Sequence, residues 1–474
     1  MIELINNSMS ANMNNKFKRL IKDIFIFSLG SLGSKLILFL LVPLYTNYLT
    51  KAEYGTAELV FTIAQLLIPI ASVTIWNGLI RYGLMNSQQP ESVFKNSILI
   101  WLFGSILIIA LTPLMDIYSP ISEWKWYLCA YSIAYIANQV ELNYLKVKGK
   151  NKLFSLISVI QTLLLTGLNI LLLVYIGIGV QGYLLSNIIA NAAAALLVLI
   201  LGELYKDWII GKFDRNLAIQ LIEYSAPLIL NDISWWFIHS SDKIMIEWII
   251  SKDELGLYTV ASKIPGLINT FVNIFSQAWG VSSIKEIESD NDSEYYSKVF
   301  RIYFFLAFGA SILFMAIIKP FMAIYVGNEF KEAWQYVPLL LVAASFSAVS
   351  AFCGSMFGAL KKSVECMWTT IIGAIANIIL NYIFISLIGT WGAIVGTVCA
   401  FFIIAVIRVY RVDKYIHIDI KFRVLAVDII VAIIEGVLVS FNWNIVLVSF
   451  VSILILIINH FDYLKLAYKR IMKS

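Results

Sequence analysis

The segment Leu49–Gly55, LTKAEYG, recurs 201 residues later as Ile250–Gly256, ISKDELG, with its Lys, Glu and Gly at matching positions. A second pair follows the same plan, since Gly179–Gly182 and Gly389–Gly392 are separated by 210 residues. Each copy lies between two long apolar stretches, at the same relative place in its half of the chain. Transporter folds are often duplicated in this way. The recurrence predicts two six-helix halves of the same orientation, related by a pseudo-two-fold axis along the membrane normal.

The composition indicates an integral membrane protein. Of the 474 residues, 60% are hydrophobic and only 14% are charged, and the mean hydropathy is +0.82, values outside the range of soluble domains. Fourteen apolar stretches of about 18 to 28 residues are each long enough to cross a bilayer as a helix. We therefore expect an all-α polytopic membrane protein with about fourteen transmembrane helices. The expected spans are 24–48, 55–80, 94–115, 121–145, 153–177, 182–204, 222–250, 256–281, 300–325, 334–359, 364–388, 391–410, 424–441 and 443–460.

The lysines and arginines fix the orientation of these spans. The alternate segments that would face the cytoplasm hold 27 of them and the opposite segments only 5. Because basic residues concentrate in cytoplasmic loops, both termini are expected in the cytoplasm. The outer loops are too short to form a domain. Lys35, Lys243 and Lys263 are the three remaining lysines, and they fall within the spans.

Several functional classes are excluded by the residues themselves. The net charge of +5 comes from the cytoplasmic loops, and no basic patch is interleaved with aromatic residues, so no nucleic-acid partner is expected. The four cysteines and three histidines show no metal-ligand spacing, so we expect no metal and no cofactor. Phosphate loops and nucleophile elbows are also missing from the sequence. The sequence thus predicts a protein that is not an enzyme.

The expected domains follow from the spans and the basic segments. Spans one to six form one lobe, spans seven to twelve a second, and two further helices come last. The predicted boundaries are 1–23 for a cytoplasmic segment, 24–205 for the first lobe, 206–216 for a linker, 217–411 for the second lobe, 424–460 for the added helices and 461–474 for a cytoplasmic tail.

Five motifs resemble those of Wzx-type polysaccharide flippases, within the multidrug/oligosaccharidyl-lipid/polysaccharide exporter superfamily. They are Ser31–Leu44 with its Pro43, the Tyr54–Gly55 turn, Leu79–Gly83, Ser241–Lys243 and Glu254–Ile264. The resemblance implies a twelve-helix core and a bacterial inner-membrane location. It also implies translocation of a polyprenyl-diphosphate-linked oligosaccharide to the outer leaflet by alternating access. The implied partners are membrane lipids, H⁺ or Na⁺ as a coupling ion, a polysaccharide polymerase and a chain-length regulator.

Four basic residues are candidates for binding the diphosphate, since lysine and arginine bind phosphate by charge and by multiple donors. Lys35 lies about 16 Å into its span at 1.5 Å per residue, and a charge near mid-bilayer costs about 2.5 to 3.5 kcal/mol. Lys263 and Lys243 are nearer the outer surface, and Arg81 ends the second span. For the lysines the competing interpretation is an ion pair between helices or snorkelling, and for Arg81 it is the orientation rule alone.

Carboxylates within the spans are candidates for ion coupling. Asp232 lies deepest among them, and Asp242 is a plausible partner of Lys263. Glu58 is a third candidate, although its place near the outer end of a span is explained equally by interfacial solvation. The same explanation applies to Glu141 near an inner end. Asp428 and Glu435 share one helix face, directed toward either the core or the lipid headgroups.

Other interpretations stay open at this point. Tyr45, Trp76, Trp235 and Trp279 could stack on sugars, but their spacing is typical of core residues. A lipid-linked peptidoglycan-precursor flippase or a drug/toxin cation antiporter would share the predicted architecture. A polysaccharide polymerase or membrane glycosyltransferase would need larger outer loops, and a scaffold would not need charged residues within its spans.

The predicted orientation can be tested by labelling. In a variant lacking the native cysteines, a cysteine at Ser251 should react with an impermeant maleimide in intact cells, whereas one at Ser474 should react only after lysis. The reverse pattern would contradict the orientation given by the positive-inside rule.

Overall fold

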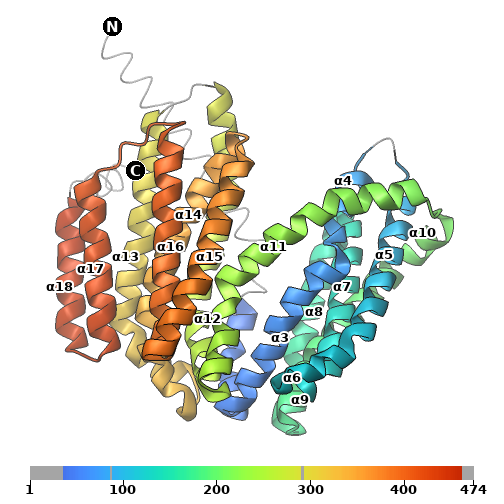
Figure 1. Ribbon diagram of the computed structural model, residues 1–474, viewed down its shortest axis with the longest axis horizontal. Helices are drawn as coiled ribbons and strands as arrows, with labels where there is room; N and C mark the ends of the chain where they lie inside the picture. The colour runs from blue at the N-terminus through green and yellow to red at the C-terminus, as the bar shows by residue number, and fades with distance from the viewer. Residues whose placement is uncertain (1–35, 86–87, 290–292, 462–474) are drawn as a thin grey trace. The chain divides into compact units, whose positions relative to one another are not determined.

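The computed structural model describes residues 36–85, 88–289 and 293–461, and all regular secondary structure among them is helical. The chain forms two compact units, which divide between Gly256 and Leu257. We call them the N-terminal unit and the C-terminal unit (Figure 1). The first twelve residues of the first expected span, 24–35, which include Lys35, lie outside the described residues.

The N-terminal unit is built from long helices joined by short turns. Its helix α7 packs on α3, α4, α5 and α9, and α11 packs on α3, α4 and α5. The elements are α2 Val42–Tyr48, α3 Lys51–Ser72, α4 Ile75–Gly83, α5 Pro90–Leu111, η1 Thr112–Ile117, α6 Ser119–Ser122, α7 Lys125–Val147, α8 Asn151–Asn169, η2 Ile170–Tyr175, α9 Gly179–Leu201, α10 Leu204–Ile210 and α11 Arg215–Ile249.

The C-terminal unit is also built from long helices joined by short connections. Helix α16 packs on α14 and α15, while α17 and α18 form a hairpin that packs on α13. The elements are α12 Lys252–Ser289, whose first turn belongs to the N-terminal unit, α13 Ser293–Tyr325, η3 Asn328–Gln335, α14 Val337–Ala359, α15 Ser363–Ile388, α16 Thr390–Asp413, α17 Phe422–Ser440 and α18 Ile445–Asn459.

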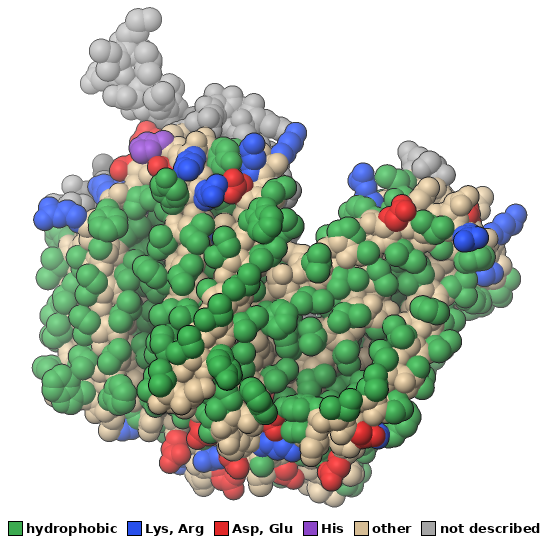
Figure 2. All heavy atoms as spheres, viewed as in Figure 1, with side chains coloured by type: hydrophobic (Ala, Val, Ile, Leu, Met, Phe, Trp, Pro, Cys, Tyr) green, Lys and Arg blue, Asp and Glu red, His purple; other side chains and the backbone are tan. Residues whose placement is uncertain are grey.

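The surface of each unit has the pattern of a membrane protein. Hydrophobic side chains cover the sides of the helices and charged side chains gather at the helix ends (Figure 2). Among the described residues, eight helices are long and apolar enough to cross a bilayer. The prediction of an all-α polytopic membrane protein is confirmed. The count of fourteen helices and the pseudo-two-fold axis stay predictions.

One expected span is not a single helix. The span at 55–80 is divided into α3 and α4 by Val73 and Thr74, which have φ values of 52° and 47°. This left-handed conformation is costly for β-branched residues and persists where surrounding contacts hold it. Such a contact is present, because Thr74 Oγ1 donates to the carbonyl oxygen of Ser225 at 3.1 Å and Ser225 Oγ accepts from the Gly78 amide at 3.2 Å. The break is therefore fixed by α11.

The unit boundary does not coincide with the expected linker at 206–216. Helix α11 follows this linker, yet its contacts with α3, α4 and α5 group it with the helices before it. The division into lobes at 24–205 and 217–411 thus stays a prediction.

The two copies of the repeated turn touch each other. A Cβ atom on Gly55 would lie 2.1 Å from the carbonyl oxygen of Lys252, and one on Gly256 would lie 2.2 Å from that of Lys51. The contacts are reciprocal, as between equivalent residues across a two-fold axis. Only glycine allows the two backbones to approach this closely.

Arg408 lies inside the C-terminal unit, near the end of the expected span 391–410. It is 1% exposed within α16. Its guanidinium donates to Thr369 Oγ1 at 2.9 Å, to the Ser350 carbonyl at 2.9 Å and to Thr370 Oγ1 at 2.7 Å. These bonds join α14 and α15 to α16 and satisfy a buried charge with neutral acceptors.

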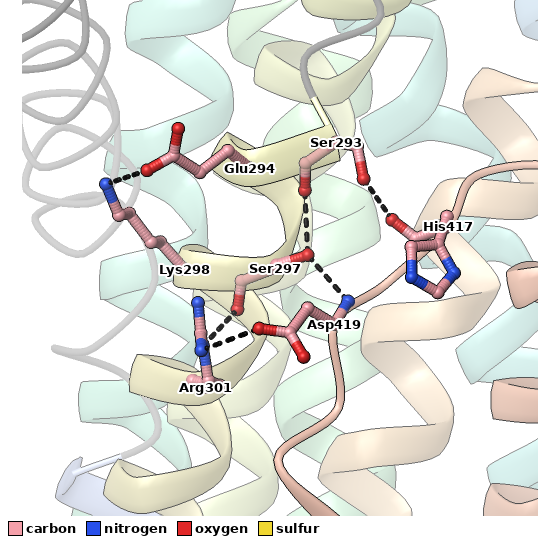
Figure 3. A network of polar contacts seen from close by, with 7 residues as sticks. All are labelled: Ser293, Glu294, Ser297, Lys298, Arg301, His417 and Asp419. Carbon is pink, nitrogen blue, oxygen red and sulfur yellow. Dashed lines mark hydrogen bonds and ion pairs between the residues drawn. The ribbon is translucent and has the colours of Figure 1, made fainter.

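A polar network fastens the connection between α16 and α17 to the start of α13 (Figure 3). Arg301 Nη1 lies 3.2 Å from Asp419 Oδ2, and the Asp419 amide donates to Ser297 Oγ at 2.9 Å. Ser293 Oγ donates to the carbonyl oxygen of His417. The connection is thereby held in place before α17 begins.

The glycine contact leads to a stability prediction. Gly55→Ala and Gly256→Ala should each lower the melting temperature of the protein, because the added methyl group would overlap a carbonyl oxygen. The measurement is the melting temperature in detergent. Gly167→Ala is the control, since its added methyl group would meet no neighbouring atom within 4 Å among the described residues. Equal melting temperatures for all three variants would show that the close approach has no role in stability.

Candidate functional site

A row of polar and aromatic side chains follows one side of α11. Positions 232, 235, 239, 243 and 247 are three or four residues apart, so they share one helix face. We call Asp232, Trp235, His239, Lys243 and Glu247 the α11 polar face. Ionisable residues inside a membrane are costly and commonly mark the path of a substrate or ion.

Lys243 is paired with Glu58 on α3. Its Nζ atom lies 3.3 Å from Glu58 Oε2, and the two side chains are only 16% and 8% exposed. One turn further along α3, the carbonyl oxygen of Thr62 accepts from Trp236 Nε1 at 2.8 Å, which fixes α11 against α3. Removing one partner of such a pair would leave a buried charge, at a cost of about 3 to 5 kcal/mol.

Tyrosine side chains surround Glu58. Its carboxylate interacts electrostatically with Tyr45 on α2, Tyr131 on α7 and Tyr183 on α9. The ring centroids of Tyr45 and Tyr183 are 4.5 Å apart, and that of Tyr54 is 6.0 Å from Tyr183. Phenols can donate to carboxylate or phosphate oxygens while their rings pack in an apolar interior.

The rest of the α11 polar face also has partners. Tyr118, which precedes α6, donates a hydrogen bond to Glu247. The His239 ring stacks on Trp235 with centroids 5.5 Å apart and interacts electrostatically with Lys243. Asp232 accepts a hydrogen bond from Asn231 at 3.4 Å and lies near Tyr135 of α7.

The structure brings together some of the residues singled out from the sequence. Lys243 and Glu58 form an ion pair, Asp232 lies on the same face of α11, and Asp242 is buried next to Lys243, whose amide donates to it at 2.9 Å. Arg81 is exposed in the last turn of α4.

The other two basic candidates are not part of this cluster. Lys263 is half-buried on α12 in the C-terminal unit, and Lys35 lies outside the described residues. The pairing of Asp242 with Lys263 and a shared cationic cavity therefore stay predictions.

Some side chains lie deeper than their sequence positions suggested. Glu58 and Glu141 are 6% and 7% exposed, so interfacial solvation does not explain them. Trp279 is fully buried, with its ring centroid 4.9 Å from that of Phe352, and is a core residue. Tyr45 belongs to the tyrosine cluster around Glu58.

His239, Glu247 and Tyr118 were not predicted. The four-residue spacing of His239, Lys243 and Glu247 was visible in the sequence and would have placed them on one face. No sequence signal identifies Tyr118, because its contact with α11 spans 129 residues.

A separate cavity of about 700 Å³ lies between α5, α7, α9 and α10. Its wall is apolar and includes Trp101, Trp208 and alanines of α7. Glu141 also lines it, and Glu141 Oε2 has no hydrogen-bond partner among the described residues. The cavity thus combines aromatic walls with one buried carboxyl group.

The C-terminal unit holds an apolar groove of about 490 Å³ between α13, α14, α16 and α17. Asp413 and Tyr410 are the titratable side chains in its lining. Since it offers no cation, the α11 polar face is the better candidate for binding an anion.

Comparison with known proteins gives consistent results. A family model described as polysaccharide biosynthesis protein matches residues 20–280. An Lsg-locus protein of Haemophilus influenzae is 21% identical over 341 residues, which cover 69% of this chain and 82% of that protein. A Haloferax volcanii protein named "Probable low-salt glycan biosynthesis flippase Agl15" is 23% identical over 260 residues, 51% of this chain and 53% of its own length. The chain thus spans about half the length of this second relative.

Among solved structures, the lipid II flippase MurJ in an inward closed conformation aligns with a TM-score of 0.67. The identity is 13%, and the alignment covers 94% of this chain and all of that one, so the likeness concerns the fold. The Haloferax protein and MurJ are named as flippases and not as enzymes, in agreement with the expectation from the sequence. Because the family model matches more than half of its length, the chain belongs to the polysaccharide biosynthesis protein family, and the resemblance recognised in its sequence is confirmed.

Proposed function

We propose that this protein is a flippase for a polyprenyl-diphosphate-linked oligosaccharide, the repeat unit of a surface polysaccharide. It moves this lipid from the cytoplasmic to the outer leaflet of a bacterial plasma membrane by alternating access. Family membership and the name of the Haloferax relative support the substrate class. The observation that carries the proposal is the buried Lys243–Glu58 pair among tyrosines in the N-terminal unit.

The pair suits a diphosphate because it holds a lysine inside the membrane with an exchangeable anionic partner. While Glu58 is ionised, its carboxylate is paired with the Lys243 ammonium. Protonation of Glu58 releases the ammonium, which can then bind a diphosphate oxygen. Proton binding and diphosphate binding therefore favour each other, and by linkage the effect is reciprocal. The proposed coupling ion is H⁺.

Other residues extend this site in the proposal. Arg81, exposed in the last turn of α4, presents five donors for a first contact with the diphosphate. Lys35 and Lys263 are proposed as further diphosphate ligands, and Asp232 and Asp242 as additional proton carriers. A polymerase and a chain-length regulator would act on the exported repeat unit.

The test compares variants of the pair in purified protein. Lys243→Gln should weaken binding of a synthetic polyprenyl diphosphate at least about tenfold, equivalent to about 1.4 kcal/mol, and Lys243→Arg should retain part of the affinity. Glu58→Gln should strengthen binding at neutral pH and remove its pH dependence, because it resembles the protonated acid. Binding is measured by intrinsic fluorescence, and flipping by a proteoliposome assay.

Lys206→Gln is the matched control. Lys206 lies 2.8 Å from Glu203 in an exposed pair of the same unit. The hydrogen bond from Lys206 lowers the pKa of the Glu203 carboxyl. This pair therefore stays ionised over the pH range in which binding by the Glu58 variants is measured. Unchanged binding and flipping by correctly folded Lys243→Gln would refute the assignment.

A second candidate, export of an organic cation, is favoured by the cavity at Glu141. Aromatic walls and one buried carboxyl group are the groups that a lipophilic cation requires. This function predicts that Glu141→Gln abolishes cation uptake into proteoliposomes while polyprenyl diphosphate binding is retained. This function would be excluded if the parent protein transported no cation and Glu141→Gln lost diphosphate flipping.

A further inference from the structure

The hairpin of α17 and α18 encloses a row of polar groups that the proposed transport site does not use. Asp428 and Glu435 are seven residues apart on α17 and are 1% and 0% exposed. Ser449 and Ser452 on α18 and His460 just after it are 3%, 5% and 5% exposed. The opposite side of α18 exposes large hydrophobic residues such as Val446 and Phe450. The polar row thus faces the interior, while the outer surface of the hairpin is apolar, as expected for helices in contact with lipid.

Asp428 is fully provided with partners. Its Oδ2 lies 2.7 Å from His460 Nε2, and its Oδ1 accepts from Asn459 Nδ2 at 2.7 Å. The His460 ring also packs on Phe305 of α13, with centroids 4.5 Å apart. Both oxygens of this buried carboxyl group are thus hydrogen-bonded, as buried polar groups require.

Glu435 has a different environment. Neither of its carboxyl oxygens has a hydrogen-bond partner among the described residues, and the hydroxyls of Ser449 and Ser452 lie beside it without meeting hydrogen-bond geometry. The adjacent Gly436 faces Leu339 and Val342 of α14. An isolated ionised carboxylate in such surroundings would be strongly destabilising.

No charged side chain within the described part of the chain compensates Glu435. The elements packed against α17 are α13, α14, α18 and η3. On α13, Lys319 donates to Asn442 at 2.8 Å and Arg301 is paired with Asp419. The titratable side chain of α14 is that of Cys353, which interacts electrostatically with Arg408. The charged side chains of η3 are Glu329, Lys331 and Glu332. Among the described residues, the polar side chains beside the Glu435 carboxyl are those of Ser449 and Ser452.

We propose that Glu435 is a proton-binding site in the α17–α18 hairpin, separate from the α11 polar face. The proton converts the carboxylate into a neutral carboxylic acid that can donate to a serine hydroxyl after a small side-chain rotation. A proton fits better than a metal cation, because hard cations require about six or more oxygen ligands and only two hydroxyls approach the carboxyl group. Release of this proton would leave an unpaired charge between α17 and α18 and so loosen their packing.

The experiment is labelling of the purified full chain with dicyclohexylcarbodiimide, which modifies protonated carboxyl groups in apolar surroundings. Mass spectrometry should find the adduct on Glu435. Labelling should fall about tenfold between about pH 6 and about pH 9, as expected for a buried carboxyl that exchanges its proton. Glu435→Gln should remove this adduct and leave the elution volume of the folded protein unchanged.

Asp428 is the internal control, because both of its oxygens are already bonded, to His460 and Asn459, and it should not be labelled. Labelling of Glu435 that does not depend on pH would overturn the proposal of an exchangeable proton, as would no labelling at all. Protection of Glu435 by sodium at constant pH would overturn the assignment of the proton as its ligand. None of these outcomes depends on flippase activity, so the result stands apart from the test of Lys243.

Discussion

The structure depends on one constraint, which is that the bilayer core supplies no water to a buried charge. Each charge must therefore find its partner among the helices of its own unit. Lys243 meets Glu58 at 3.3 Å, and Asp428 meets His460 at 2.7 Å. These polar contacts decide which helix faces turn inward, since the apolar faces pack equally well against lipid.

Arg408 and Lys243 satisfy this constraint with different chemistry. The partners of Arg408 are mainly hydroxyl and carbonyl oxygens, with Cys366 Sγ further away at 3.5 Å. None of them is a carboxylate, and the arrangement joins three helices. The partner of Lys243 is a carboxylate, which can accept a proton. One buried cation is therefore held mainly by neutral oxygens, while the other is held by an ionisable carboxyl group.

The sequence was sufficient for the helices but not for their contacts. Hydropathy and the distribution of basic residues depend on local composition, so the membrane fold and the approximate spans could be predicted. The break at Val73 and Thr74 could not, because neither residue favours a left-handed backbone and the contact that holds it comes from Ser225. The burial of Glu58 could not be predicted for a similar reason. Its burial depends on the rotation of α3 against α11, which a linear pattern does not encode.

The reciprocal contact of Gly55 and Gly256 bears on how the two turns can diverge. Replacing either glycine with a larger residue would place its side chain against the backbone of the other turn. No substitution in that other turn can relieve the overlap, because every residue retains its main-chain carbonyl oxygen. Neither copy can drift at this position independently, whereas the flanking helices can exchange one apolar residue for another. This mutual restriction explains why glycine stands at both places.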